Sequence, residues 1–459
     1  MVSPDLRLRY QLMTETDTLS DAVDPAREYI WELPNPPREL EPLTRYHAGG
    51  LHPVHLADMY NGARYRIVNK LGFGSSSHVW LGEDTTAKQR PTRPLALKFI
   101  EAKASERTLE IEIHKYLSAA AGEAGSKHIL PFLDTFRVEG PNGVHNVIVS
   151  DGALAFIPAL CKYKILEDLD ETEIVRQIFE GVAFLHENGV VHRDLHCGNI
   201  GIEIPFFRTA GIRKLTYGDP PIIFPSTLCE AVEHPPSVPK YIVQSSPALV
   251  DRYQYKDAPG GPLVVKLVDF GCAFRPGTDS VFPTGSPRRT LAAPECLVSE
   301  IHLPPSVPEK VWTFKSDIWT LGCTLVELYS RLGHSLFDGA GSSSLGAEMA
   351  KLVGPIPDMY HCLLDDNATL HHSDTHNAQS DADTEEDDIP ANWKTLETSL
   401  VAARTPRHPP SAEDELKRVD RDTKDVQRFL PLIKQMLRWN AEDRIQASEA
   451  LESSFLVEK

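Results

Sequence analysis

Two short stretches decide the fold, and the first is His192-Arg193-Asp194-Leu195-His196-Cys197-Gly198-Asn199. The second follows an apolar run later in the chain and is Lys266-Leu267-Val268-Asp269-Phe270-Gly271. Together they place two aspartates and one asparagine at fixed positions. Because an unrelated chain would rarely carry both stretches in this order, the other segments are interpreted around them.

The three polar side chains match the needs of phosphoryl transfer. Asp194 is expected to accept the proton of a substrate hydroxyl and to align that hydroxyl, while Asn199 and Asp269 are expected to ligate Mg²⁺. This chemistry consists mostly of positioning and charge neutralisation, so an asparagine and two aspartates suffice. The pattern therefore predicts a kinase.

A glycine- and serine-rich turn joins two strand-like runs, residues 65–71 and 78–81. Small residues in such a turn let backbone N–H groups approach phosphate oxygens. A third strand-like run, residues 95–100, carries Lys98, which is expected to hold the α- and β-phosphates. The predicted nucleotide-binding residues are Leu71, Gly72, Phe73, Gly74, Ser75, Ser76, Ser77, Val79, Ala96, Lys98 and Asp151.

Two assignments around this site follow from alignment along the chain. A helical carboxylate should orient Lys98; Glu110 is the preferred candidate and Glu112 the competing one. Ser150 is predicted to stand at the gate of the adenine pocket, with Asp151 on the hinge.

His196 raises an alternative class. Most protein kinases carry lysine at this position, whereas small-molecule kinases of the aminoglycoside phosphotransferase type often carry histidine. Three later features resemble protein kinases and decide against that class. They are Ala293-Pro294-Glu295, the helix around Asp317 whose carboxylate should brace the catalytic loop, and Arg444, which should pair with Glu295.

Residues 46–455 resemble the SR-protein-specific kinases. The resemblance rests on Tyr46-His47-Ala48-Gly49-Gly50-Leu51-His52-Pro53-Val54, Lys70-Leu71-Gly72-Phe73-Gly74 and Ser77-His78-Val79-Trp80-Leu81. That family shares the Tyr-x-x-Gly-Gly-x-His-Pro-Val motif, and it also has serine in place of the third loop glycine. A long insertion between Asn199 and Asp269 is similar to the family, and residues 238–243 resemble its fungal members.

The resemblance implies an α+β, bilobal eukaryotic protein kinase fold, with a small β-rich N-terminal lobe and a larger, mainly helical C-terminal lobe. It implies ATP and Mg²⁺ as cofactors and basic, Arg/Ser-rich splicing factors as protein substrates, and so a role in mRNA processing. The catalytic residues would be Asp194, Lys98, Glu110, His196 and Asn199. We expect a monomer of the cytoplasm and nucleus, the nuclear share resting on the resemblance alone.

Some positions depart from the family. Arg193 replaces its threonine and could pair with a phosphate on Thr284, Ser286 or Thr290. His196 would carry less positive charge than lysine at pH 7. A kinase-shaped scaffold that transfers phosphate poorly is therefore the second hypothesis.

Composition limits the partners. The 459 residues have a formal net charge of −18 at pH 7, which argues against binding a nucleic-acid backbone and permits basic protein partners. Nucleic acid is therefore not expected as a direct partner. No secretory signal or membrane-spanning apolar stretch is expected either, so a membrane should not be a direct partner. Seven scattered cysteines suit a reducing compartment.

The expected organisation has three parts. Residues 1–45 should form a poorly ordered lead-in, 46–151 the N-terminal lobe and 152–459 the C-terminal lobe. Two insertions interrupt the last part: a stretch at 205–262 with ten prolines, and an acidic loop at 366–389 that is expected to be mobile.

Overall fold

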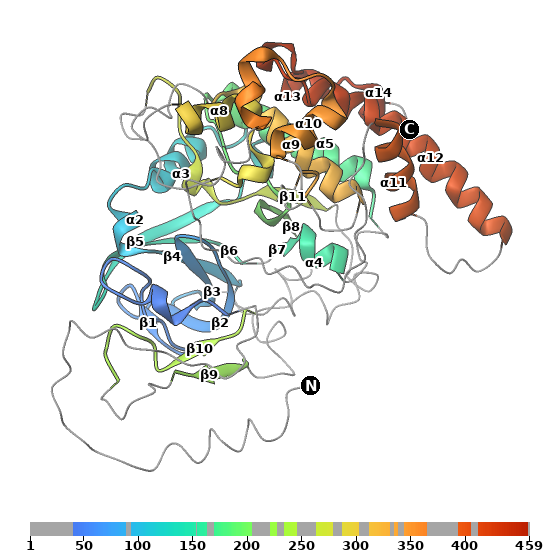
Figure 1. Cartoon of the computed structure of the whole chain (residues 1–459). Coiled ribbons are helices and arrows are strands. Elements are labelled where there is room, and N and C mark those ends of the chain that lie inside the picture. Colours follow the sequence, from blue (N-terminus) through green and yellow to red (C-terminus); the bar gives the residue numbers. More distant parts are fainter. Residues whose placement is uncertain are drawn as a thin grey trace. The chain divides into compact units, whose positions relative to one another are not determined.

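A computed structural model describes the chain in segments (Figure 1). These are residues 40–88, 93–152, 154–162, 169–203, 221–226, 234–245, 263–278, 287–302, 312–330, 335–337, 344–364, 393–404 and 412–457. They divide into two compact units. The first holds the described residues within Met1–Thr108, Pro131–Ala153 and Pro205–Gly260, and the second holds those within Leu109–Leu130, Leu154–Ile204 and Gly261–Lys459.

A six-stranded antiparallel sheet forms the first unit (Figure 1). Its strands are β1 (Met59–Tyr60), β2 (Tyr65–Phe73), β3 (Ser77–Asp84), β4 (Leu95–Ile100), β5 (Phe132–Gly140) and β6 (Gly143–Asp151), in the spatial order β1-β2-β3-β4-β6-β5. A short helix, α2 (Ala102–Ser105), follows β4, and a 3-10 turn at Leu43–Arg45 precedes the sheet. The three strand-like runs predicted from the sequence are all present.

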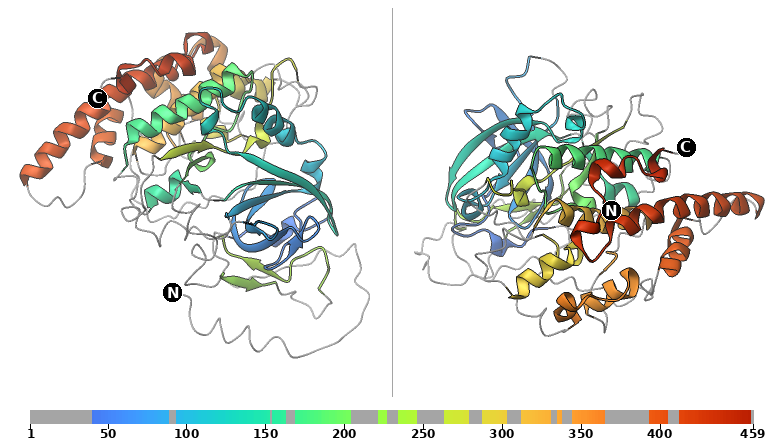
Figure 2. Two further views of the ribbon diagram at one scale, coloured as in Figure 1. Left: turned by 180° about the vertical axis from the view of Figure 1, so that it is seen from behind. Right: turned by 90° about the horizontal axis from the view of Figure 1, so that it is seen from above.

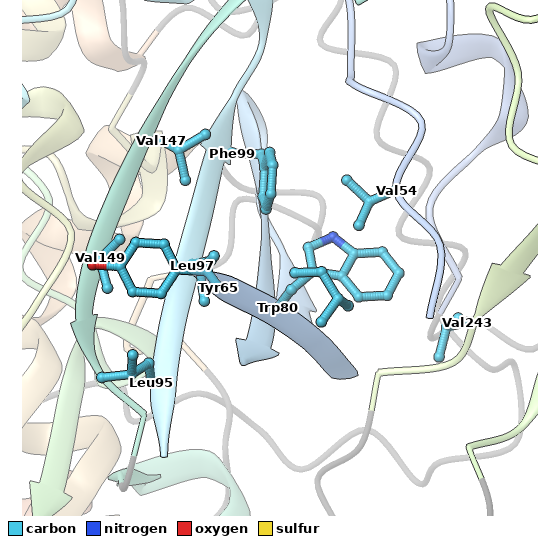
Figure 3. Close-up of a cluster of buried hydrophobic side chains, with 10 residues drawn as sticks. Val54, Tyr65, Trp80, Leu95, Leu97, Phe99, Val147, Val149 and Val243 are labelled. Atoms are coloured by element: carbon cyan, nitrogen blue, oxygen red, sulfur yellow. The ribbon is translucent and has the colours of Figure 1, made fainter. Parts of the chain in front are cut away.

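The hydrophobic core of this unit lies on the sheet and draws on residues outside it (Figure 3). Leu97 and Phe99 of β4 and Trp80 of β3 are almost completely buried. Val54, upstream of the sheet, and Val243, from the long insertion, belong to the same cluster. Burial of such side chains contributes roughly 1.5–3 kcal/mol each, so segments far apart in sequence share one stabilising core.

The described part of the insertion packs on the first unit. Its strands β9 (Ile223–Pro225) and β10 (Tyr241–Val243) form an antiparallel hairpin, and the Tyr241 hydroxyl accepts a hydrogen bond of 3.0 Å from the backbone N–H of Leu56. A second buried cluster joins this hairpin to the chain before the sheet; its members are Leu40, Leu43, Tyr46, Leu51, Val238 and Ile242.

The division into units differs from the expected organisation in three respects. The insertion was assigned to the C-terminal lobe, but its described residues, 221–226 and 234–245, belong to the first unit. Residues 109–130 were assigned to the N-terminal lobe, but they belong to the second unit. The lead-in was expected to extend to residue 45, yet Leu40, Glu41 and Leu43 are buried. Apolar pairing with the hairpin orders these residues. The acidic loop at 366–389 lies outside the described residues.

Three buried histidines in the first unit make its stability sensitive to acid. Burial lowers the pKa of His52 to about 4, with a smaller contribution from nearby His145, whose ring centroid is 5.0 Å away. Burial also lowers the pKa of His145 and holds that of His78 well below its ordinary value. All three are therefore neutral in the folded protein at pH 7.

We expect stability to fall as pH drops from 6.5 to 4. In this window the unfolded chain binds protons that the folded chain excludes, so the unfolding free energy decreases with falling pH. His52 alone should account for roughly 3 kcal/mol of that loss. Urea unfolding of the unaltered chain and of His52→Asn between pH 4 and 6.5 measures this loss of unfolding free energy. If the unfolding free energy of the two proteins changed equally with pH, the prediction would be wrong.

The described residues of the second unit are mainly helical and include a small sheet, in the order β11-β8-β7. These strands are β7 (Leu154–Phe156), β8 (Ile200–Glu203) and β11 (Val264–Leu267). The helices are α3 (Glu110–Ala119), α4 (Ile157–Lys162), α5 (Glu171–Glu187), α8 (Pro294–His302), α9 (Phe314–Ser330), α10 (Leu345–Val353), α11 (Trp393–Arg404), α12 (Ala412–Met436), α13 (Ala447–Ala450) and α14 (Ser454–Val457). Figure 2 shows α11 beside α12 in both views.

Asp170 followed by Glu173 is a capping-box pattern, and Ile174, Ile178, Val182 and Leu185 fall on one helical face, so the sequence predicts helix α5 here. The Asp170 carboxylate accepts a 3.0 Å hydrogen bond from the backbone N–H of Glu173 and so caps the helix. The predicted apolar face is buried, with Ile174 2% exposed and Ile178 and Leu185 fully buried. No helix in the described part of the chain is long and apolar enough to cross a bilayer.

Candidate active site

The glycine-rich turn of the first unit is a hairpin between β2 and β3. Antiparallel pairing aligns Gly72 with Val79, and the Gly74 N–H donates to the Ser77 carbonyl at 2.9 Å. A Cβ atom added at Gly72 would meet nothing within 4 Å, and one at Gly74 would meet only Ser77 Oγ at 4.0 Å. The backbone is thus open to an approaching ligand, which fits a phosphate-binding loop.

The neighbouring strands hold the other predicted nucleotide residues of this unit. Lys98 on β4 lies opposite Val79 of β3 and Ile148 of β6, while Ala96 lies opposite Ser150. The Asp151 side chain is 2% exposed and is paired with Arg93. Because the Asp151 carboxylate is paired with Arg93, we expect the backbone of Asp151, and not its side chain, to contact adenine.

In the second unit, Asp317 braces the catalytic loop. Its two carboxylate oxygens accept hydrogen bonds of 2.8 Å from the backbone N–H groups of His192 and Arg193. Asp317 is fully buried, and Arg193 has a left-handed backbone with φ of 68°. The carboxylate stabilises this strained turn, as the sequence predicted.

Asp194 and Asn199 lie together. The Asn199 side-chain amide donates to the Asp194 backbone carbonyl at 2.9 Å and to its carboxylate Oδ2 at 3.1 Å. The Asn199 carbonyl accepts from the N–H of Val268 at 3.1 Å, which ties this loop to the residue before Asp269. Asp194 and Asn199 are therefore hydrogen-bonded to each other, and the residue before Asp269 is bonded to the same loop.

Asp269 has an unusual backbone and a well-packed neighbour. Its φ is 62°, and its carboxylate Oδ1 accepts from the Gly271 N–H at 3.1 Å. Phe270 is fully buried between His114 and His192, with ring centroids 5.0 and 5.2 Å away. Packing of Phe270 fixes where the chain turns, and so the position of the Asp269 backbone.

His192 is a neutral imidazole. Its Nδ1 accepts from the Asp194 N–H at 3.3 Å, and its Nε2 lies 3.1 Å from the Val268 carbonyl, to which it donates. Burial lowers its pKa, and a neutral ring with its proton on Nε2 makes both hydrogen bonds. His192 thus links the loop at Asp194 to the segment at Asp269.

The two candidate helical carboxylates differ in burial. Glu110, the first residue of α3, is 2% exposed, whereas Glu112 is exposed to solvent. A buried carboxylate needs a polar partner, while an exposed one is hydrated. Glu110 stays the preferred candidate for the carboxylate that orients Lys98, and this pairing stays a prediction.

His196 is held by its own loop. Its Nδ1 accepts from the Gly198 N–H at 2.9 Å, so a proton on Nε2 is the tautomer that keeps this bond. Nε2 lies 3.5 Å from Asp194 Oδ2. A Cβ added at Gly198 would come within 2.7 Å of the His196 ring, which explains the glycine. The sequence did not predict this local role.

The predicted pair of Glu295 and Arg444 is present. Arg444 Nη1 and Nη2 donate to the two Glu295 oxygens at 2.7 and 2.8 Å, and the guanidinium lies 5.1 Å from the centre of the Trp319 ring. Arg444 is 1% exposed. A bidentate pair of this kind fixes the end of the segment that begins at Asp269.

Arg193 lies in a buried environment. It is 4% exposed, its guanidinium is 5.2 Å from the centre of the Trp312 ring, and burial lowers its pKa. Thr290 is partly buried, whereas Thr284 and Ser286 lie outside the described residues. Pairing of Arg193 with a phosphorylated residue therefore stays a prediction.

The donor set suits Mg²⁺. Asn199 and Asp269 offer oxygen ligands, which Mg²⁺ prefers, and this ion commonly takes one or two protein ligands together with nucleotide phosphates. No group of three or more His, Cys, Asp or Glu side chains that could hold a metal occurs among the described residues. The two oxygen donors of Asn199 and Asp269 therefore fit an ion whose other ligands come from a nucleotide.

Comparisons with known proteins agree with this geometry. The protein kinase domain family matches residues 65–205. The kinase domain of a solved structure, PF14_0431, aligns with a TM-score of 0.52 and 17% identity over 88% of this chain and 99% of that one. The chain has the protein kinase fold. This confirms the predicted fold class, a β-rich sheet followed by a mainly helical region.

Relatives are distant serine/threonine kinases. A serine/threonine protein kinase of Aspergillus fumigatus is 26% identical over 91% of both chains. The kinase spk-1 of Caenorhabditis elegans is 31% identical over 40% of this chain but only 18% of its own length. The human SRSF protein kinase 3 is 33% identical over 35% of this chain and 29% of its own. The similarity to SR-protein kinases is thus partial and distant.

Sequence reasoning missed two arginines near the site. Arg93 pairs with Asp151, and Arg45 contacts the glycine-rich turn. Arg45 stands directly before the Tyr46–Val54 motif, and this adjacency is the feature of the sequence that could have indicated a role for it.

Proposed function

We propose that this chain is a serine/threonine protein kinase that uses ATP and Mg²⁺. The observation that carries the proposal is the hydrogen-bonded group of Asp194 and Asn199, braced by Asp317. Preorganised groups of this kind lower the barrier because they need not rearrange during reaction. The kinase fold supports the same class.

Each residue then has a role. Bound ATP with Mg²⁺ would supply the phosphoryl group and neutralise its developing charge. Asp194 orients the substrate hydroxyl and takes its proton as the oxygen bonds to phosphorus, while the bond to the ADP oxygen breaks. Asn199 and Asp269 would hold Mg²⁺, and Lys98 would hold the α- and β-phosphates, with Glu110 as the carboxylate that would orient it.

The nucleotide contacts extend over the first unit. The backbone of Gly72 to Ser77 would cover the phosphates, because its glycines leave that surface open. Leu71, Val79 and Ala96 would contact the adenosine, and the Asp151 backbone its adenine edge. Ser150, 7% exposed, would line the adenine pocket.

The proposed substrates are basic, Arg/Ser-rich proteins. The net charge of −18 favours basic partners. The name of the human relative, SRSF protein kinase 3, gives SRSF proteins as the substrates of that enzyme. By this analogy the chain would act on splicing factors in the cytoplasm and nucleus.

A kinase-shaped scaffold is the second candidate, and His196 is the observation that favours it. The side chain is tied to Gly198, and as the tautomer that keeps this bond it carries no full positive charge toward a γ-phosphate. The chain would then bind ATP or partners with little transfer.

We expect Mg²⁺-dependent transfer of labelled phosphate from ATP to an Arg-Ser repeat peptide, with turnover of about 1–100 s⁻¹. A neutral serine peptide and a generic basic protein serve as controls. Transfer to the basic protein alone would keep the kinase and discard the substrate class. ATP binding with no transfer to any of these would replace the enzyme by the scaffold.

A further inference from the structure

The Tyr46–Val54 motif folds into a turn that positions Arg45, the residue before it. Gly49 has a φ of 86°, and a Cβ added at Gly50 would lie 2.1 Å from the Arg45 carbonyl oxygen. The Leu51 N–H donates to that same oxygen at 2.9 Å. Only glycine allows this close approach, so the Gly-Gly pair holds the Arg45 backbone against the turn.

The Arg45 side chain reaches the tip of the glycine-rich turn. Nη1 donates to the Gly74 carbonyl at 2.6 Å, and Nη2 donates to the Ser75 carbonyl at 2.9 Å. Nε and Nη2 also donate to Glu101 Oε1, at 3.1 and 2.7 Å. Glu101 follows the strand of Lys98, so one guanidinium joins that strand to the turn.

These contacts determine where the amide donors of the turn point. In a planar trans peptide the C=O and the following N–H point in opposite directions. Because the Gly74 and Ser75 carbonyls face Arg45, the N–H groups of Ser75 and Ser76 face away from it. Among the described residues neither N–H has a hydrogen-bond acceptor. Two adjacent free amides form an anion-binding arrangement.

A buried ion pair anchors the same segment beside β2. The Glu41 carboxylate, 1% exposed, pairs with the Lys70 ammonium, which is fully buried, and accepts from the Tyr46 hydroxyl at 2.7 Å. The Lys70 Nζ lies 5.3 Å from the centre of the Trp80 ring. Burial lowers the pKa of Lys70, and Glu41 opposes that shift. The segment that carries Arg45 is therefore fixed at two points.

We infer that Arg45 is a positioning residue for ATP: it holds the turn so that the Ser75 and Ser76 amides bind phosphate oxygens. The inference rests on the proposed ATP-binding function. It gives the Tyr46–Val54 motif a role in nucleotide binding, through Arg45, rather than in folding alone. Arg45 itself touches only protein atoms in this arrangement, so its effect on ATP is indirect.

The test compares ATP with adenosine, which has no phosphates. For Arg45→Ala, we expect the Kd of ATP–Mg²⁺ to rise about tenfold, since about one hydrogen bond to a charged group is lost in effect. The Kd of adenosine should stay unchanged, and the KM for ATP should rise more than kcat falls. Arg45→Lys keeps the charge and should recover part of the affinity. Calorimetric titration measures both ligands.

Arg66→Ala is the matched control, because Arg66 forms an arginine–glutamate pair with Glu83 at 2.7 Å on the same hairpin, away from the turn. It should bind ATP normally. Equal ATP affinity of Arg45→Ala and the unaltered chain would overturn the inference and leave the proposed function intact. Equal weakening of ATP and adenosine would also overturn it, since it indicates a general structural loss. Failure of the unaltered chain to bind ATP would overturn both proposals.

Discussion

The Asp194→Asn variant is expected to bind ATP like the unaltered chain and to transfer phosphate about 10²–10⁴-fold more slowly. An amide cannot accept the hydroxyl proton, so the variant lacks the proton acceptor that we propose for the reaction. The fold should survive, because the Asp194 side chain is 18% exposed and its backbone carbonyl still accepts from Asn199. Initial rates with labelled ATP and an Arg-Ser repeat peptide measure the change.

Asp420→Asn provides the control for this change. Asp420 lies on the exposed side of α12, 66% exposed and paired with Lys424, so removing its charge should leave the rate unaltered. Transfer by Asp194→Asn at the rate of the unaltered chain would show that another group takes the proton. His196, with Nε2 at 3.5 Å from the same carboxylate, would then be the first residue to substitute.

The parts of the site that the sequence predicted are those with strong local motifs. Asp317 was expected to brace the catalytic loop and Glu295 to pair with Arg444, and both contacts are present. Each of these contacts is made by a residue within a short sequence motif that lies in a loop or at the start of a helix. The kinase fold was predictable for the same reason, because the motifs occur in one order along the chain.

The contacts that the sequence left open depend on distant packing. Glu110 and Glu112 are two residues apart on one helix, and only the tertiary structure shows that the first is buried. The insertion strands β9 and β10 have three residues each, too few for a clear alternating pattern. Their place on the first unit follows from apolar partners nearly two hundred positions earlier, such as Leu43.

Helix boundaries were the least predictable feature. The apolar residues from about Phe429 to Arg438 predict a helix over that stretch, whereas α12 runs from Ala412 to Met436. Its first half is rich in charged residues and has Leu416 and Val419 as its only large apolar residues, and Pro431 lies inside the helix. Proline usually interrupts a helix, so the pattern indicated a start near that point. Packing against α9 and α11 keeps the helix continuous.

The Glu295→Ala variant is expected to lose about 3–5 kcal/mol of unfolding free energy, the cost of leaving a buried charge without its partner. Arg444 is 1% exposed and would keep only backbone carbonyl acceptors, including those of Arg438 at 2.9 Å and Lys315 at 3.0 Å. These dipoles cannot neutralise a guanidinium as a carboxylate does. Denaturant unfolding at pH 7 measures the change.

Two further variants separate the ion pair from packing. Arg444→Met keeps an apolar contact with Trp319 and leaves Glu295, 16% exposed, able to meet water. The double variant Glu295→Ala/Arg444→Met should therefore lose less unfolding free energy than the two single variants lose together. The difference between the two losses is the coupling energy of the pair. Asp420→Ala, which breaks the exposed pair with Lys424, should leave stability unaltered. If Glu295→Ala behaved like Asp420→Ala, the buried pair would not stabilise the fold around Glu295, and that stability would come from buried apolar residues such as Leu291 and Ala293.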